Sequence, residues 1–167
     1  MKHLITQTYK SYLLNPLEMK IILIENQYYK IYTDPTKNRI YFSVVGSIKD
    51  INAIPCFVED WKKAISEVEI NFTVLSDVRA MGMQSKTVAK LQECIQSYLI
   101  QKGISEVAEV MAINDIADLQ SSHIVERSGM PTTKFASVEE AENYLNKIVV
   151  AFAKLDAIKK ENDILPN

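Results

Sequence analysis

Apolar positions along the chain follow two spacings, and the change from one to the other falls near residue 50. Before that point, β-branched and aromatic residues gather in short runs that suit a pleated sheet. These runs predict strands at 27–33 and 39–45, and a strand or a lead-in at 19–25. The linking segment DPTKN opens with a common turn dipeptide, so the two later strands are predicted to form a β-hairpin.

Beyond residue 50, apolar positions recur every three or four residues, which is typical of helices with one buried face. Four helices are predicted, at 51–68, 85–103, 115–128 and 137–160. Short apolar runs between them predict strands at 71–77, 107–112 and 133–136. Ser85 is the expected N-cap of the second helix, and Ser137 with Glu140 forms a capping box before the last one. The third helix has a weak core stripe of Ile116, Leu119 and Ile124.

This order of elements predicts an α/β fold of about four helices. Strand–helix–strand units give parallel pairs, so we expect a mostly parallel or mixed sheet opened by an antiparallel β-hairpin. One domain is expected over 19–150. Residues 1–18 are interpreted as an N-terminal extension, with Met19 as an equally good start, and residues 151–167 as the continuation of the last helix and a polar tail.

Composition narrows the class of protein. The 167 residues are 47% hydrophobic and 24% charged, with a net charge of −2, so the lack of a basic field disfavours nucleic-acid binding. No apolar run approaches the ~20 residues of a membrane span, and the N-terminus lacks a secretory signal, so we expect a cytoplasmic protein. Cys56 and Cys94 fall among apolar residues and are predicted to be buried thiols.

Polar residues follow the strand at 71–77, at the edge where open α/β sheets place their sites. Asp77 and Arg79 either hold a polar ligand or a partner's charge, or have a local role as a solvated ion pair or as a turn capped by Asp77. Asn114 follows the next strand and is expected beside them, with Asp115 as the preferred N-cap of the helix that begins there.

Several segments have the pattern of one protein family: YYKIYTDPTKNRIYFSVVG, FTVLSDVR before a helix beginning QSKTVAKL, KGISEVAEV and FASVEEAENYL. With the order of elements, they make residues 20–148 resemble the STAS domain, the fold of SpoIIAA-like bacterial anti-sigma factor antagonists. The chain is more closely similar to small bacterial STAS-like proteins that are grouped with the CRAL-TRIO lipid-binding superfamily.

The resemblance implies a phosphorylation switch at the start of the helix that follows FTVLSDVR. The matching residue is Ser85, with Thr87 as second choice, and Lys86 and Arg79 would pair with a phosphate at the helix N-terminus. The family motif places an acidic residue before the serine and a glycine two positions after it. Here Gln84 precedes Ser85 and no glycine follows, so the residues themselves favour a plain N-cap.

Six of the eight tyrosines lie in the first 41 residues. Alternation along the strands turns Tyr41 away from the core and sends Tyr28 and Tyr29 to opposite faces. An exposed tyrosine patch there would favour a protein partner or a homodimer, unless residues 1–18 cover it. The heptad-like spacing of the last helix offers a second dimer surface.

No pattern in the chain indicates catalysis. His3 and His123 have no ligand-type spacing with the cysteines, and Glu106 with Glu109 is interpreted as a solvated strand face, so no metal, cofactor or enzyme activity is expected. We therefore predict a non-enzymatic interaction or regulatory module that binds a protein partner and is regulated by phosphorylation. The alternative is a small carrier or sensor of an apolar, lipid-like ligand.

Overall fold

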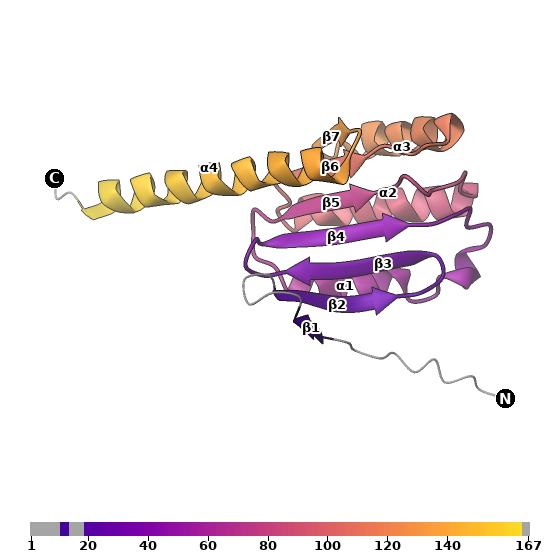
Figure 1. The fold of residues 1–167 in the computed structure, drawn as a ribbon, viewed down its shortest axis with the longest axis horizontal. Coiled ribbons are helices and arrows are strands. Elements are labelled where there is room, and N and C mark those ends of the chain that lie inside the picture. The colour runs from indigo at the N-terminus through magenta and orange to yellow at the C-terminus, as the bar shows by residue number, and fades with distance from the viewer. Residues whose placement is uncertain (1–10, 14–18, 165–167) are drawn as a thin grey trace.

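The computed structural model describes the backbone of residues 11–13 and 19–164, and the side chains from residue 24 to residue 160. Its centre is a seven-stranded sheet whose strands lie side by side in sequence order (Figure 1). The strands are β1 (Ser11–Leu13), β2 (Met19–Glu25), β3 (Tyr29–Asp34), β4 (Arg39–Val44), β5 (Thr73–Asp77), β6 (Glu106–Val110) and β7 (Thr132–Phe135). β1 pairs with β2, and the rest of the extension predicted for 1–18, with His3, lies outside the described residues.

Two kinds of pairing divide the sheet. β1 to β4 pair antiparallel, whereas β4 to β7 pair parallel through helical connections. β3 and β4 form the predicted hairpin, and Asn38 in its turn takes the left-handed conformation, with φ of 49°. The predicted mixed sheet with an antiparallel opening is therefore confirmed, and 19–25 is a strand.

Helices cover both faces of this sheet, as Figure 1 shows. α1 (Phe57–Ser66), α2 (Lys86–Gln101) and α3 (Asp115–Ser128) pack on one face, and α4 (Val138–Ile164) crosses the other. A short 3-10 helix, η1 (Ile51–Ala53), precedes α1, so the helix predicted at 51–68 is divided. Pro55 lies at the break, where it has no N–H to continue the helical hydrogen bonds.

Side-chain caps mark the beginnings of α2, α3 and α4. Ser85 Oγ accepts from Val88 N at 3.3 Å, and Ser137 Oγ accepts from Glu140 N at 3.2 Å, as the caps predicted from sequence require. The N-cap of α3 is Asn114 and not Asp115, because Asn114 has the extended backbone of a cap and its Oδ1 accepts from Ala117 N at 3.0 Å. Asp115 is already helical, where its charge favours the positive end of the helix dipole.

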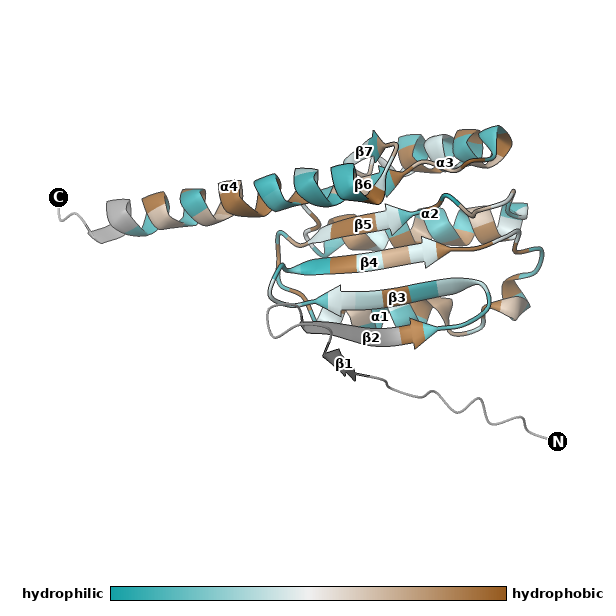
Figure 2. Ribbon diagram, viewed as in Figure 1, coloured by the Kyte–Doolittle hydropathy of each residue, from teal (hydrophilic) through white to brown (hydrophobic). Residues whose placement is uncertain are grey.

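The last helix is longer than the sheet that it covers. Ala141 and Leu145 are fully buried near its start, against a cluster that includes residues of β5 and β6. Farther along, Val150, Leu155 and Ile158 are 52%, 52% and 53% exposed. Figure 2 shows this part of α4 running past the sheet with apolar turns still along it. The heptad-like stripe is thus covered by the domain only in its first turns.

Candidate functional site

Three loops meet at the carboxyl ends of the parallel strands. The loop after β4 joins the loop after β5, because Gly46 N donates to Ala80 O (2.8 Å) and Gly82 N donates to Gly46 O (2.9 Å). The loop after β6 joins them through Ile113 N, which donates to Arg79 O (3.2 Å). The predicted site residues carried by this edge are Asp77, Arg79, Ser85, Lys86, Thr87 and Asn114.

Gln84 ties these loops together, a role that the sequence did not reveal. The residue is 4% exposed. Its Nε2 donates to the carbonyls of Gly46 (2.9 Å) and Gly82 (2.7 Å), and its Oε1 accepts from Ile48 N (2.9 Å). Its backbone also exchanges two hydrogen bonds with the Gln120 side chain of α3, at 2.8 and 3.0 Å. An ionised carboxylate at this position could not donate to the two carbonyls, so the site requires an amide side chain.

Ser85 follows Gln84 directly and is the N-cap of α2. Its Oγ accepts from Val88 N and lies 3.1 Å from Thr87 Oγ1. Ser85 itself is half-buried, whereas Lys86 and Thr87 are exposed. The N-cap interpretation therefore describes the structure, and a phosphoacceptor role for either hydroxyl stays a prediction.

Asp77 and Arg79 form the ion pair that was one of their two predicted roles. Arg79 Nε donates to Asp77 Oδ1 (2.9 Å) and Arg79 Nη2 donates to Asp77 Oδ2 (2.7 Å). These hydrogen bonds from Arg79 lower the pKa of Asp77 despite its partial burial. Because the Arg79 side chain is 47% exposed, the pair contributes little to stability and leaves charge at the loop surface.

A groove of about 620 Å³ separates α2 from α3 beside Ser85. Its lining includes Lys86, Lys90 and Glu93 of α2, and Ile116, Leu119 and Arg127 of α3. Ile116 and Leu119, predicted as core residues, are instead 63% and 57% exposed, and only Ile124 of that stripe is buried. The weak periodicity of the third helix was the sequence signal for this difference, because an apolar residue off the core face disrupts the stripe.

The rim of the groove carries mainly positive charge. Lys90 and Arg127 both pair with Glu93, at 2.8 and 3.0 Å, and Lys86 adds a further cation. Two further apolar side chains, Met83 and Ile113 of the loops, are 51% and 83% exposed. Exposed apolar surface with a polar rim is typical of protein interaction sites.

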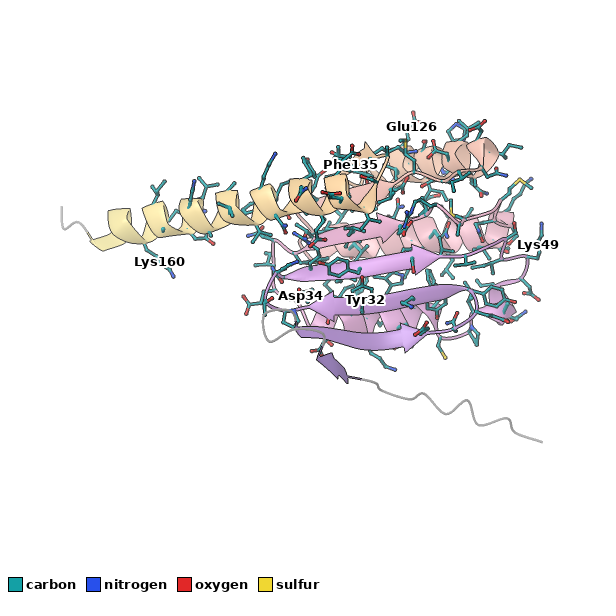
Figure 3. The ribbon with its side chains drawn as sticks, viewed as in Figure 1. Tyr32, Asp34, Lys49, Glu126, Phe135 and Lys160 are labelled. Atoms are coloured by element: carbon teal, nitrogen blue, oxygen red, sulfur yellow. The ribbon has the colours of Figure 1, made fainter. Side chains whose placement is uncertain are left out.

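The predicted tyrosine surface does not form among the described residues. Tyr29 and Tyr41 are 3% and 5% exposed, and Tyr28 is half-buried. Tyr29 OH donates to Asp60 Oδ2 (2.7 Å), and burial raises the pKa of Tyr29. Tyr41 does face away from Ile40, but α4 covers that face. Tyr32, which is labelled on β3 in Figure 3, stacks on Tyr41 with ring centroids 4.6 Å apart. The helices on the two faces therefore leave only Tyr28 partly exposed among the three tyrosines of the predicted surface.

Both cysteines differ from their prediction. Cys56 and Cys94 are exposed free thiols. Cys56 immediately precedes α1, outside the helix that was expected to bury it, and Cys94 lies on the outward side of α2. Apolar neighbours in sequence do not bury a residue whose position on the helix faces away from the sheet.

A smaller cavity, of about 60 Å³, lies between the sheet and the helices α1, α2 and α3. Glu109 lines it and is 4% exposed, so the strand face predicted to be solvated is buried under α3. Ser121 Oγ donates to Glu109 Oε2 (2.8 Å), and burial raises the pKa of Glu109. The cavity is much smaller than the ~150 Å³ that holds one benzene, so it does not admit a lipid tail.

Within the described residues, no group of three or more histidine, cysteine, aspartate or glutamate side chains is placed to hold a metal ion. In the same part of the chain, no helix combines the length and the apolar character that crossing a bilayer requires.

The fold and this loop edge define a small α/β protein with a mixed seven-stranded sheet that helices cover on both faces. No family model matches the chain, and no curated protein matches it. Among solved structures, the chain is similar to an uncharacterized protein of the DUF3478 family with a SpoIIAA-like fold, from Shewanella loihica PV-4. The two are 13% identical over 78% of this chain and 97% of the other, with a TM-score of 0.48. The likeness is one of fold.

Proposed function

We propose that this protein is a non-enzymatic interaction module that binds a protein partner in the groove between α2 and α3. The observation that carries this proposal is the exposure of Ile116 and Leu119, 63% and 57%, on the wall of that groove. Fully burying a side chain of this kind is worth ~1.5–3 kcal/mol, so a partner that covers both gains substantial binding energy. Met83 and Ile113 add two exposed apolar side chains on the loops.

The charges around the groove favour an acidic amphipathic segment as the occupant. Lys86, Lys90 and Arg127 contribute three cations to the lining, against the single carboxylate of Glu93. A helix that places apolar residues three or four positions apart on one face could cover Ile116 and Leu119 together. Acidic residues flanking that face would meet the basic rim, which favours correct orientation and fast association.

Phosphorylation at Ser85, or at the more exposed Thr87, would regulate this binding. A phosphate adds about two negative charges, and it would sit at the N-terminus of α2 next to Lys86. It would neutralise part of the basic rim and repel an acidic partner. The proposed effect of phosphorylation is therefore release of the partner.

The groove is tested by capture of partners from the source cells with four baits: wild type, Ile116→Asp, Leu119→Asp and Ile70→Asp. Ile70 is the matched control, because it is 73% exposed and lies in the loop before β5, at the opposite end of the strand from the groove. We expect specific proteins to be retained by wild type and Ile70→Asp and lost with both groove variants. Retention of the same proteins by Leu119→Asp would show that the groove is not the binding site.

The switch is tested separately with purified partner by titration calorimetry. Ser85→Asp should weaken binding at least tenfold, and Ser85→Ala should bind like the wild type, since a small loss of helix capping leaves the groove intact. Ser66→Asp, an exposed serine at the end of α1, is the charge control. Equal affinity of Ser85→Asp and Ser66→Asp for the partner would exclude regulation at Ser85 without excluding the interaction module.

The exposed part of α4 supports a second contact, to another copy of this chain. Its heptad-like stripe continues through Phe152 and Leu155 after the covered turns end, and such spacing is typical of helices that pair with helices. We expect a dimer in sedimentation velocity at micromolar concentration, and a monomer for Leu155→Lys. A monomeric wild type would exclude this contact without affecting the groove.

A further inference from the structure

The smaller cavity, which lies beneath α2, crosses several strands of the sheet. Phe42, Ser76 and Glu109 line it and stand opposite one another on β4, β5 and β6. Neighbouring strands lie ~4.8 Å apart, so this row spans about 10 Å from Phe42 to Glu109. Trp61 of α1 packs on Phe42, with ring centroids 5.1 Å apart, and therefore marks the end of the cavity opposite Glu109.

Two residues of the lining, Trp61 and Glu109, each have a buried polar atom that lacks a hydrogen-bond partner. Among the described residues, neither Trp61 Nε1 nor Glu109 Oε1 has one, although the two residues are only 3% and 4% exposed. The nearest cation to Glu109 Oε1 is Lys134 Nζ at 3.6 Å, beyond hydrogen-bond distance. Lys134 donates instead to Asp118 Oδ1 (2.7 Å) and Ser122 Oγ (2.8 Å).

Leaving a polar group buried and unpaired costs ~1–3 kcal/mol, so two such groups lining one hollow indicate a site that something else completes. The wall between them is largely apolar, and includes Phe57, Val74, Ile95 and Leu99. A molecule that fills the cavity therefore needs a short apolar body and hydrogen-bonding groups at its two ends. The volume of about 60 Å³ limits that body to a few heavy atoms.

The charge of the occupant follows from the Glu109 end. Burial raises the pKa of Glu109, which favours its uncharged form, and a carboxyl group in that form both donates and accepts a hydrogen bond. An anionic group would lose its hydration in a largely apolar cavity, and an ammonium group would in addition be repelled by Lys134. An uncharged hydroxyl or amide avoids both conflicts.

We propose that this cavity binds a small uncharged molecule with a short aliphatic body and a hydrogen-bonding group at each end, such as a short diol or hydroxy amide. One end accepts from Trp61 Nε1, and the other exchanges a hydrogen bond with Glu109 Oε1. Ser76, Gln92 and Gln96 also line the cavity and supply further polar contacts. This site is distinct from the groove between α2 and α3, because it lies on the side of α2 that faces the sheet.

The probe for this site is 1,3-propanediol, with 1-propanol as the matched compound that lacks the second hydroxyl. Trp61 is the only tryptophan of the chain, so its indole N–H gives a single, unambiguous NMR signal. We expect 1,3-propanediol to shift that signal and the backbone amides of β6 saturably, with a Kd in the millimolar range. The Kd for 1-propanol should be at least tenfold higher, because only one polar end of the cavity is then satisfied.

Three variants locate the binding. Trp61→Phe removes the indole donor, Glu109→Met removes the carboxyl group, and Val74→Ile fills the cavity while all polar groups remain. Each should raise the Kd for 1,3-propanediol at least tenfold, read from the β6 amides, in a spectrum whose dispersion reports an intact fold. A linear, non-saturating shift in the wild type would overturn the proposal and leave the cavity to water. Equal affinity of wild type and Val74→Ile would overturn it too, because binding would then occur elsewhere.

Discussion

The carboxylate of Glu142 on α4 lies 2.8 Å from the guanidinium of Arg39 on β4, a side chain with no solvent exposure. Lys37 Nζ and Tyr41 OH converge on the same Glu142 oxygen, at 2.7 and 2.9 Å. This cluster attaches the last helix to the hairpin that opens the sheet, across more than a hundred residues of sequence. It explains why a largely exposed helix is fixed at its start.

Replacing Glu142 with alanine should therefore destabilise the protein by about 2–3 kcal/mol, since hydrogen bonds to charged groups are worth ~1.5–3 kcal/mol and Arg39 would be left buried without its carboxylate. The estimate stays below that for a fully buried pair because the Glu142 side chain is 23% exposed. Urea denaturation measures the change. Asp156→Ala, an exposed carboxylate on the same helix, should change stability by less than about 0.5 kcal/mol.

The same cluster predicts a loss of stability in acid. Burial alone would raise the pKa of Glu142, but the hydrogen bond from Lys37 and the charge of Arg39 outweigh it and lower that pKa. A depressed pKa contributes stability that is present above the unfolded-state pKa of ~4.3 and is lost as the pH falls through the folded value. Stability measured from pH 6 down to pH 3 should fall more steeply in the wild type than in Glu142→Gln. Parallel curves would contradict this prediction.

Glu109 should have the opposite pH dependence, because burial raises its pKa. Above the unfolded-state pKa of ~4.3, the native state then binds more protons than the unfolded state, so the contribution of Glu109 to stability falls as the pH rises through the folded value. Glu109→Gln should gain stability relative to the wild type between pH 4 and pH 8. Glu106→Gln, on the same strand but half-buried, is the control, and a gain of equal size there would count against the assignment.

The hydrogen bonds of Gln84 predict that Gln84→Glu is strongly destabilising, although the two side chains have the same shape. A carboxylate cannot donate to the carbonyls of Gly46 and Gly82, and its burial adds a desolvation cost, so we expect a loss of about 2–4 kcal/mol. Thermal unfolding measures the loss against Gln27→Glu, an exposed loop residue. An unchanged melting temperature would show that the loops do not depend on this side chain.

The exposure of Cys56 and Cys94 predicts that both thiols react with a small aromatic disulfide reagent in the native protein. Without denaturant, the wild type should release two equivalents of the aromatic thiolate per chain. Cys56→Ser and Cys94→Ser should each release one equivalent. Reaction only after unfolding would restore the buried placement expected from sequence.

The groove between α2 and α3 shows which features could be predicted from sequence and which could not. The loop edge with Asp77, Ser85 and Asn114 could be located, because strand ends and caps leave local signals. Ile116 and Leu119 were assigned to the core, since periodicity tells that a residue is apolar but not whether its side of the helix meets the sheet. The buried positions of Gln84 and Glu109 were not predicted, for a related reason. Their partners, Gly46 and Ser121 among them, are distant in sequence or belong to another element.

The sequence by itself determined the order and most of the bounds of the elements, the hairpin turn, and the caps at Ser85 and Ser137. These depend on contacts within a few residues and on the period of apolar positions, both of which are written locally in the chain. Only the tertiary structure decided that α4 covers Tyr41, that Arg39 is buried with Glu142, and that Glu109 and Trp61 share a cavity. Those relationships require two faces of one sheet and helices far apart in sequence to come together, and burial is a property of that assembly.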